Sequence, residues 1–487
     1  LEHRGGCQRA NTHTKLMAFR LLSGEAVGCE AEIGNYGTQV AVGMARAVLA
    51  KHLCLELERV RLVSLGALLE DGDSFVMEDS CVTVQVMPDP LEADFARAMG
   101  LEHFADAMKE PCIEIRSAQL VELPRGLGNL RDLEELHLSS NKLRQLPETL
   151  GQLTKLRDLR VDANMLTSLP SSIGLSLSLR ELHLSSNELT TLPQSIGDLK
   201  SLETLNLFYN EITELPESLG QLQKLRKLHL GSNRLEKLPE SIGELSLLQE
   251  LYLANNELSR LPESLCELCQ LQMVQLGSNP LTELPEALGH LQALQELHLG
   301  SAKLQILPES IGDLPEISQL YLASNKLTAL PSSFSMAKLQ KLSLRSNAIE
   351  KLDDSFCRLE NLKKLFLDSN ELRELPASFG ELKALEELHI SDNYLSEIPE
   401  SFGRLSKLQE LRLAGNDLTT LPESFGELQE LKELFLSFNP LESLPQSMSQ
   451  LESLEELHLQ TTKLTELPDC VVQLKDNTGI LVVWSEC

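Results

Sequence analysis

The sequence lacks the segments that place a protein in or across a membrane. No apolar run approaches the ~18 residues of a membrane-spanning helix, and no charged and then apolar signal peptide opens the chain.

The ten cysteines also lack the spacing of a disulfide framework. Cys266 and Cys269 form a C-x-x-C without a second pair, so we expect free thiols in a reducing compartment. These absences predict a cytoplasmic protein, with the nucleus as the alternative location. Because the chain begins at Leu1 rather than Met, we expect the natural protein to contain residues before it.

Positive charge is scarce relative to negative charge. Forty-three Lys and Arg residues stand against 72 Asp and Glu residues, which gives a formal net charge of −29. Such an excess repels phosphate backbones and anionic lipids, so we expect neither nucleic acid nor a membrane surface as a partner. The charge favours a protein partner with a basic surface, or it serves only to solvate the exterior. The composition leaves both interpretations open.

A 23-residue unit repeats from about Cys112 to Leu474. The unit reads L-x-x-L-x-L-x-x-N-x-L-x-x-L-P-x-x-I/L/F-G-x-L-x-x, and sixteen registers fit it. One step of 22 residues reflects a deletion around Ser335. Three registers have Ala118, Ala302 or Thr462 in place of the asparagine. The asparagine position is filled by Asn141, Asn164, Asn187, Asn210, Asn233, Asn256, Asn279, Asn325, Asn347, Asn370, Asn393, Asn416 and Asn439.

Each repeated position predicts a structural role. The L-x-L core, such as Leu136 and Leu138, predicts a short strand with both leucines facing inward. The asparagine amide is expected to bond to the backbone and to form a ladder in stacked repeats. The Leu-Pro pair predicts the end of the strand, followed by a short helix or turn on the convex side. Glycine, as in Gly151, is predicted to occupy a bend with positive φ. The predicted fold is therefore an α/β solenoid of about 16 repeats, with a parallel sheet on its concave face.

This repeat unit resembles the intracellular Ras-group leucine-rich repeats. That group includes the Scribble-like scaffolds, the Ras-pathway scaffolds and the plant intracellular Ras-group-related proteins. The resemblance covers about three quarters of the chain and implies a leucine-rich-repeat solenoid. It also implies that the concave face binds a small GTPase, a phosphatase or another signalling protein.

Catalytic motifs are missing from the chain. The glycine-containing stretch Gly34–Gly43 lacks the Gly-Lys-Ser/Thr of a phosphate-binding loop, and no kinase catalytic-loop motif is present. Six histidines share the position between the two strand leucines: His137, His183, His229, His298, His389 and His458. We predict that they face solvent about 10 Å or more apart, too far to share a metal. We therefore expect no enzyme activity, cofactor, metal or small-molecule substrate.

The segment 15–90 has a different pattern from the repeats. Its order of elements predicts strands at Met17–Leu22, Ala26–Ile33, Val60–Leu65 and Val82–Val86, with a helix at Val40–Leu53. This order and the stretch Arg61–Gly72 resemble the ubiquitin-like β-grasp fold. The predicted domains are 15–90 as β-grasp, 91–111 as linker or capping helix, 112–474 as solenoid and 475–487 as tail, with residues 1–14 flexible.

The ubiquitin resemblance has limits. The last strand runs into Met87–Pro90 without a Gly-Gly, which excludes conjugation, and Thr83 and Gln85 replace apolar residues of ubiquitin's main binding patch. The resemblance therefore implies a small domain that caps the repeats or binds a partner other than ordinary ubiquitin receptors.

The variable residues of the concave strands are the candidate binding residues. Aromatic side chains there indicate anchors for a protein partner, because such residues dominate interface energetics. An acidic row beside them, from Glu135 to Glu456, predicts attraction to a basic surface. Some of these rings are alternatively expected to pack over the edge of the ladder. The candidates form one group, Asn206, Phe208, Tyr209, His229 and Tyr252, and a second, Phe366, Arg412, Phe435 and Phe438.

These patterns favour a non-catalytic scaffold or adaptor that holds a signalling protein on the concave face. The alternative is a ubiquitin-pathway adaptor, in which the β-grasp domain engages the degradation machinery and the repeats select the substrate.

Overall fold

The computed structural model describes the chain from Pro90 to Trp484 apart from residue 102, together with the backbone of seven strands before Pro90. The chain divides into two compact units, residues 1–107 and 108–487, and each is described by itself. Throughout the described residues, every helix is too short or too polar to cross a membrane.

The first unit contains two sheets. The larger has the strand order β2-β1-β7-β4-β5, with β1 parallel to β7 and the other neighbours antiparallel. The smaller pairs β3 with β6. The bounds are β1 Lys15–Leu21, β2 Ala26–Ala31, β3 Gln39–Ala41, β4 Val60–Ser64, β5 Ala67–Leu69, β6 Ser74–Val76 and β7 Val82–Val86. Four of these, β1, β2, β4 and β7, overlap the predicted strands, and the ends of β1, β2 and β4 differ from the prediction by one or two residues.

The predicted helix at Val40–Leu53 lies outside the described residues except at its start. There Val40 and Ala41 belong to β3 instead, so the prediction is wrong for these two residues. The predicted linker or capping segment contains helix α2, Pro90–Ala98, and the 3-10 helix η2, Phe104–Lys109. Phe95 is buried and meets the Phe104 ring edge-on, with ring centroids 5.9 Å apart.

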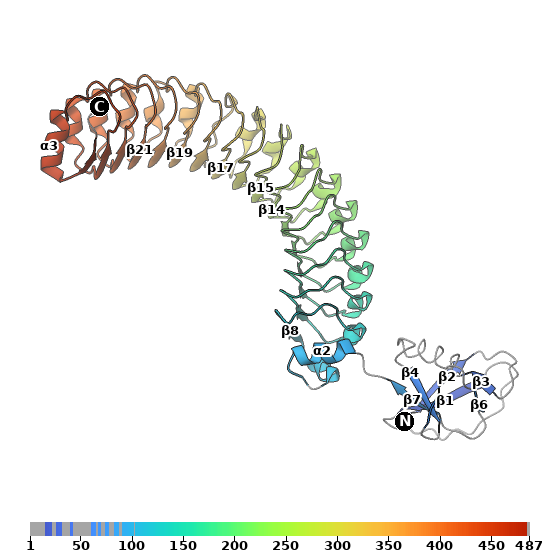
Figure 1. The fold of residues 1–487 in the computed structure, drawn as a ribbon. Coiled ribbons are helices and arrows are strands. Elements are labelled where there is room, and N and C mark those ends of the chain that lie inside the picture. Colours follow the sequence, from blue (N-terminus) through green and yellow to red (C-terminus); the bar gives the residue numbers. More distant parts are fainter. Residues whose placement is uncertain are drawn as a thin grey trace. The chain divides into compact units, whose positions relative to one another are not determined.

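The second unit is a stack of three-residue parallel strands. Each strand pairs residue for residue with the next, as Leu159 pairs with Leu182. Figure 1 shows these strands along the inner side of an arc. They are β8 Cys112–Glu114, β9 Glu135–His137, β10 Asp158–Arg160, β11 Glu181–His183, β12 Thr204–Asn206, β13 Lys227–His229, β14 Glu250–Tyr252, β15 Met273–Gln275, β16 Glu296–His298, β17 Gln319–Tyr321, β18 Lys341–Ser343, β19 Lys364–Phe366, β20 Glu387–His389, β21 Glu410–Arg412, β22 Glu433–Phe435, β23 Glu456–His458 and β24 Leu481–Val483.

The convex side of the arc consists mainly of 3-10 helices (Figure 1). Most begin directly after the Leu-Pro pair, and Pro147 at such a start has φ of −71°. This confirms that proline presets the backbone where the strand segment ends. The helices are η3 Arg125–Asn129, η4 Glu148–Gln152, η5 Ser171–Leu175, η6 Gln194–Asp198, η7 Glu217–Gln221, η8 Glu240–Glu244, η9 Glu263–Glu267, η10 Leu288–His290, η11 Glu309–Asp313, η12 Asp354–Arg358, η13 Phe379–Glu381, η14 Glu400–Arg404, η15 Glu423–Glu427 and η16 Gln446–Gln450.

The interior of the solenoid is built from the repeated apolar positions. The middle leucine of nearly every strand is fully buried, as at Leu136 and Leu411. In the C-terminal repeats Phe379, Phe402 and Phe425 stack with ring centroids 5.9 Å apart and almost parallel planes. Each interior repeat therefore shares its core with two neighbours, which is why a single repeat could not bury enough apolar surface to fold.

The predicted asparagine ladder is present. In the repeat of Asn233, the side-chain Nδ2 donates to the carbonyls of Leu230 (3.0 Å) and Leu207 (2.9 Å). Its Oδ1 accepts from the backbone N–H of Ile212 at 3.0 Å. Leu207 and Ile212 belong to the preceding repeat, so each amide satisfies buried backbone groups on both sides of a repeat boundary.

The predicted role of the repeated glycine is wrong. Gly151 does not have positive φ; the residue before each asparagine does, with Ser140 at 59° and Ser232 at 56°, and this residue is glycine only at Gly415. A Cβ atom on Gly151 would lie 2.3 Å from the carbonyl oxygen of Ser172 in the next repeat. Glycine is therefore needed for close approach of successive 3-10 helices, because any side chain would meet backbone.

Two regions depart from the regular repeat. The shortened repeat around Ser335 forms turns instead of a 3-10 helix between β17 and β18. At the C-terminal end, helix α3 (Asp469–Thr478) replaces the 3-10 helix and β24 pairs with β23. The segment predicted as a tail therefore continues the sheet by one strand, with Val482 in the position of the strand leucine.

Candidate protein-binding face

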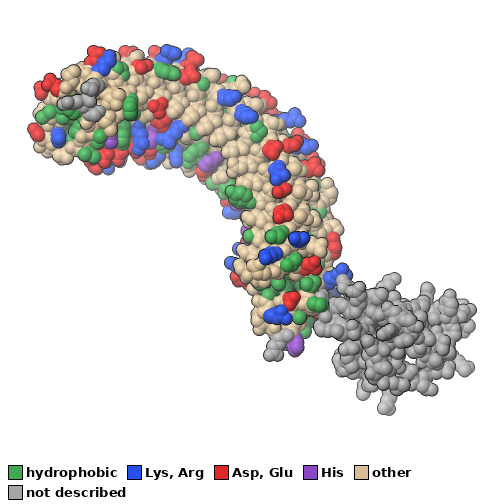
Figure 2. All heavy atoms as spheres, in the orientation of Figure 1, with side chains coloured by type: hydrophobic (Ala, Val, Ile, Leu, Met, Phe, Trp, Pro, Cys, Tyr) green, Lys and Arg blue, Asp and Glu red, His purple; other side chains and the backbone are tan. Residues whose placement is uncertain are grey.

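The concave face presents the first and third residue of each strand, because the middle leucine points into the core. In-register pairing aligns these residues into two columns across the strands. The first column contains the whole predicted acidic row, namely Glu135, Asp158, Glu181, Glu250, Glu296, Glu387, Glu410, Glu433 and Glu456. Figure 2 shows charged and histidine side chains gathering along the inner edge of the arc toward its C-terminal end.

Basic side chains neutralise part of the acidic row. Lys227 Nζ lies 2.8 Å from Glu250, and Lys364 Nζ lies 2.6 Å from Glu387. Arg412 Nε lies 2.6 Å from Glu410. Within the described residues, carboxylates with a Lys or Arg partner therefore stand beside others without one, such as Glu433, and the row is not a uniform negative strip.

The structure brings the first group of candidates together, and we call it the Phe208 patch: Asn206, Phe208, Tyr209, His229 and Tyr252. Phe208 and Tyr209 meet edge-on with ring centroids 4.5 Å apart. The Phe208 ring lies over Gly231 in the next repeat, where a Cβ atom would come within 2.9 Å of it. His229 and Tyr252 stack with centroids 4.3 Å apart.

The backbone of Tyr209 marks this patch as unusual. Tyr209 stands immediately before Asn210 and has φ of 54°, in the left-handed region that bulky residues rarely adopt. Serine fills this position in many other repeats, and Phe438 is the other aromatic residue in it. Tyr209 is 59% exposed and Phe438 63% exposed, so neither ring gains enough burial to explain its presence. Such an outlier points to a role on the surface.

Hydrogen bonding and burial fix the protonation states in the patch. The Tyr252 hydroxyl donates to Glu250 at 3.0 Å, and burial together with this carboxylate raises the pKa of Tyr252 to about 12. Burial lowers the pKa of His229. At neutral pH the patch therefore presents a neutral imidazole and a phenol, which suits aromatic contact with a partner.

The second group of candidates does not form one patch. Phe366 belongs to a polar network three repeats before Phe435. Its ring meets His389 edge-on at 4.9 Å, and the Arg345 guanidinium lies 4.6 Å from its centroid.

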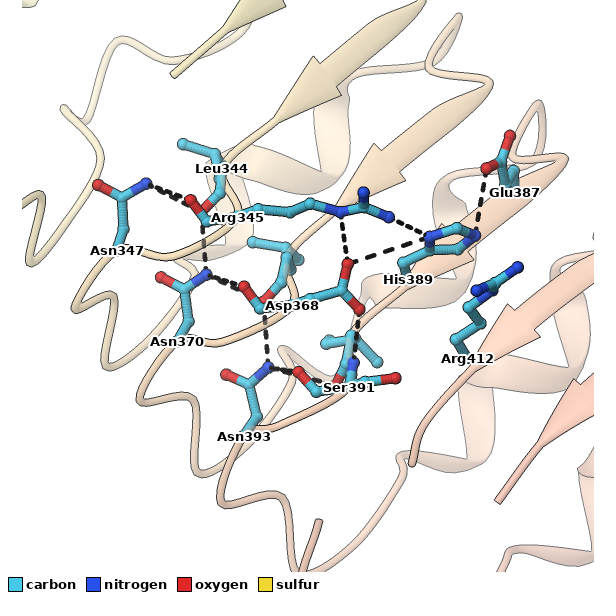
Figure 3. A network of polar contacts seen from close by, with 12 residues as sticks. Leu344, Arg345, Asn347, Asp368, Asn370, Glu387, His389, Ser391, Asn393 and Arg412 are labelled. Carbon is cyan, nitrogen blue, oxygen red and sulfur yellow. Dashed lines mark hydrogen bonds and ion pairs between the residues drawn. The ribbon is translucent and has the colours of Figure 1, made fainter. Parts of the chain in front are cut away.

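Figure 3 shows this polar network in detail. Arg345 Nε donates to Asp368 at 2.6 Å, and a second nitrogen of Arg345 contacts His389 Nδ1. The other carboxylate oxygen of Asp368 accepts from the backbone N–H of Ser391 at 3.0 Å. His389 Nε2 lies 2.9 Å from Glu410. Burial lowers the pKa of His389. The polar groups of this network bond mainly to one another. The network therefore stabilises the concave face and leaves few of its groups available to a partner.

The remaining residues of the second group, Arg412, Phe435 and Phe438, lie in two adjoining repeats. Together with His458 of the following repeat, we call them the Phe435 patch. Phe435 and His458 stack with centroids 4.5 Å apart. The Arg412 guanidinium lies 4.8 Å from the Phe435 centroid. Phe438 follows on the same repeat as Phe435, at the strained position described above.

The sequence prediction missed Tyr321. This residue is the third residue of β17, and its ring stacks on His298 with centroids 4.2 Å apart. The Lys341 ammonium lies 5.0 Å from the same ring. The signal was present, because Tyr321 shares the sequence position of Tyr252.

The prediction that the six histidines face solvent is wrong for His389, which is only 5% exposed. The other five lie half-buried on the concave face, and four of them contact a carboxylate of the first column. Among the described residues, three groups bring a histidine to within 4.8 Å of other possible metal ligands: Cys112–Glu135–His137, Asp158–Glu181–His183 and Glu387–His389–Glu410. Arginine side chains already bond to carboxylates in the last two groups. These arrangements therefore act as hydrogen-bonded pairs that hold the rings in place.

Comparison with known proteins supports this description. A family model described as a leucine-rich repeat region matches residues 171–255, 219–302 and 350–440, and a second leucine-rich-repeat model matches residues 132–153. A leucine-rich-repeat protein of Leptospira interrogans is 34% identical, with 69% of this chain and 93% of that chain covered and a TM-score of 0.63. No curated protein matches the sequence.

Two further solved structures are similar. The leucine-rich effector YopM from Yersinia pestis is 29% identical, with 75% of this chain and 94% of that chain covered and a TM-score of 0.55. The plant peptide hormone receptor RGFR1, in complex with RGF2, is 28% identical, with 78% and 67% covered and a TM-score of 0.64.

Proposed function

Because the chain belongs to the leucine-rich-repeat family, we propose that it is a non-catalytic scaffold or adaptor that holds a signalling protein on its concave face. The Ras-group form of the repeat makes a Ras-like small GTPase or a phosphatase the favoured class of partner. A cytoplasmic location is part of the same proposal.

The observation that carries the proposal is the Phe208 patch. Four ring side chains from three successive repeats form two contacting pairs there, Phe208 with Tyr209 and His229 with Tyr252. Grouped aromatic side chains of this kind form the centre of many protein interfaces. The exposure of Tyr209 adds to this argument, since serine fills the same left-handed position in many other repeats and the tyrosine ring gains little burial there. The solved complex of RGFR1 with RGF2 provides a related example in which repeats of this family bind a peptide hormone.

We expect the double substitution Phe208→Ala and Tyr209→Ser to weaken partner retention by about tenfold or more, since truncating central aromatic anchors costs about 2 kcal/mol or more each. The measurement is a quantitative pull-down from source cells with the full chain, comparing wild type and the variant. Tyr209→Ser restores the residue found at this position in many other repeats, so the melting temperature should not fall.

A matched control for this experiment is Tyr394→Ser. Tyr394 is 51% exposed but lies just after its asparagine, away from the ring column. Retention that is unchanged in the Phe208/Tyr209 variant would show that the patch is packing rather than a binding site.

We also propose that the first unit is a ubiquitin-like β-grasp domain. The strand order β2-β1-β7-β4-β5, with a parallel central pair, supports this assignment. On the alternative view of the protein as a ubiquitin-pathway adaptor, this domain engages the degradation machinery.

Removing residues 1–89 tests that alternative. We expect the shortened chain to fold and to retain the concave-face partner, because it keeps the whole of the second unit, which is compact by itself. Proteasome or ubiquitin-ligase subunits that are retained by the full chain and lost from the shortened one would support the adaptor function. Aggregation of the shortened chain would show instead that the first unit is a cap.

A further inference from the structure

We propose that the Phe435 patch, with Glu433 and Glu456 beside it, binds an arginine side chain of the partner that is flanked by an apolar residue. The inference rests on the proposed function, because it assigns the chemistry of one contact on the same concave face. It starts from the uneven distribution of charge along the acidic row.

Four consecutive strands, β20 to β23, have glutamate in the first column. The register places Glu387, Glu410, Glu433 and Glu456 beside one another, and neighbouring strands lie about 4.8 Å apart. Like charges at this spacing repel, so an array of this kind is unfavourable unless cations neutralise it.

The chain neutralises only the first half of this array. Glu387 pairs with Lys364, and Glu410 pairs with Arg412 and His389. Glu433 forms no ion pair within the part of the chain that the structure describes, and Glu456 pairs only with His458, at 3.4 Å. Partial burial and the flanking carboxylates of Glu410 and Glu456 raise the pKa of Glu433. The second half of the array therefore has a deficit of positive charge.

Arg412 shows how this face accommodates a guanidinium. Its Nε bonds to Glu410, in the first column of the same strand, while its planar group lies over the Phe435 ring of the next strand. Arg345 makes the same pair of contacts with Asp368 and Phe366. In both cases a carboxylate supplies charge and an aromatic ring supplies a flat apolar surface.

The next repeat offers the carboxylate without the cation. Glu433 is the first residue of β22, but the third residue of this strand is Phe435 rather than arginine, and the Phe435 ring already contacts His458 and the Arg412 guanidinium. A partner arginine beside Glu433 would supply the missing charge. Guanidinium fits better than ammonium, because it is planar and bonds to carboxylates in a forked geometry.

Phe438 specifies the residue next to that arginine. Its ring is 63% exposed and stands on the strained backbone position. An exposed ring beside an uncompensated carboxylate fits an apolar side chain that neighbours the cation on the partner.

The test uses the full chain and a fluorescein-labelled peptide of alternating arginine and leucine, followed by fluorescence anisotropy. The comparison peptide replaces each arginine with citrulline, which preserves shape and removes the charge. We expect the arginine peptide to bind at least about tenfold more tightly than the citrulline peptide, and high salt to reduce this difference.

Matched variants separate a specific site from the overall negative charge. Glu433→Gln with Glu456→Gln should weaken arginine-peptide binding about tenfold, whereas Glu135→Gln with Glu181→Gln, which changes the net charge equally in the same column, should leave it within about twofold. Phe438→Ser should weaken binding by about fivefold without lowering the melting temperature. Equal weakening by the two Gln pairs, or equal binding of the two peptides, would overturn the proposal.

These outcomes are distinguishable from failure of the proposed function. If the Phe208/Tyr209 variant loses the cellular partner but the Gln pairs do not differ in peptide binding, the concave scaffold stands and the arginine site is wrong. If the peptide discriminates as expected but wild type retains no protein from cells, the arginine site stands and the scaffold proposal is wrong.

Discussion

Replacing Asn233 with alanine is expected to lower the free energy of unfolding by about 3 kcal/mol or more. The substitution removes bonds to Leu207 O, Leu230 O and Ile212 N–H, all of which lie inside the solenoid. A buried polar group without a partner costs about 1–3 kcal/mol, and several such groups are left at one repeat boundary. Urea unfolding followed by circular dichroism measures the loss.

The repeat of Ala302 provides the reciprocal experiment. Ala302 occupies the asparagine position of an interior repeat, between Asn279 and Asn325, and has no side-chain amide. Ala302→Asn should raise the stability, because it adds the missing bonds at a buried site. Hydrogen exchange should show faster opening around Ile212 in the first variant and slower opening around Leu281 in the second. A loss below about 1 kcal/mol for Asn233→Ala would contradict the role given to the ladder.

Replacing Gly197 with alanine is expected to cost about 3 kcal/mol, the upper part of the range for overpacking. The new Cβ atom would lie 2.3 Å from the carbonyl oxygen and 2.8 Å from the Cβ of Ser218 in the next repeat. Because the obstacle is backbone, the two 3-10 helices have to move apart. Thermal unfolding of the variant measures the effect.

The matched control is Gly300→Ala, on the strand side of the repeat. There the nearest atom to the added methyl group is Ala323 O at 3.4 Å, an ordinary contact distance. We expect its stability to stay within about 0.5 kcal/mol of wild type. Equal effects at Gly197 and Gly300 would mean that helix spacing on the convex side is not limiting.

The regular part of the fold could be predicted from the sequence because each repeated column has one local cause. The L-x-L period gives the strands, proline gives the start of the 3-10 helices, and asparagine gives the ladder. The reason for the glycine column could not be predicted. It depends on contact with a residue 21 positions later, such as Ser172 for Gly151, and only the stacked structure brings these two together.

The candidate residues of the concave face were predictable by position and less so by environment. The sequence placed Phe208, Tyr209 and Tyr252 near one another because the repeat length converts sequence spacing into spatial neighbourhood. It could not reveal that His389 is buried between Arg345 and Glu410, because those contacts involve side-chain conformations across three strands. The left-handed backbone of Tyr209 and Phe438 could not be predicted either, because the type of a residue does not determine its φ.

The left-handed position before each asparagine has a consequence for how such a protein changes over generations. It accepts Ser140, Ala163, Tyr209, Asn255, Asp392, Gly415 and Thr461 with nearly the same backbone angle. The surrounding strands and helices keep their spacing whichever side chain stands there. Single exchanges at this position can therefore change the exposed surface one repeat at a time, while the backbone of the solenoid is inherited unchanged.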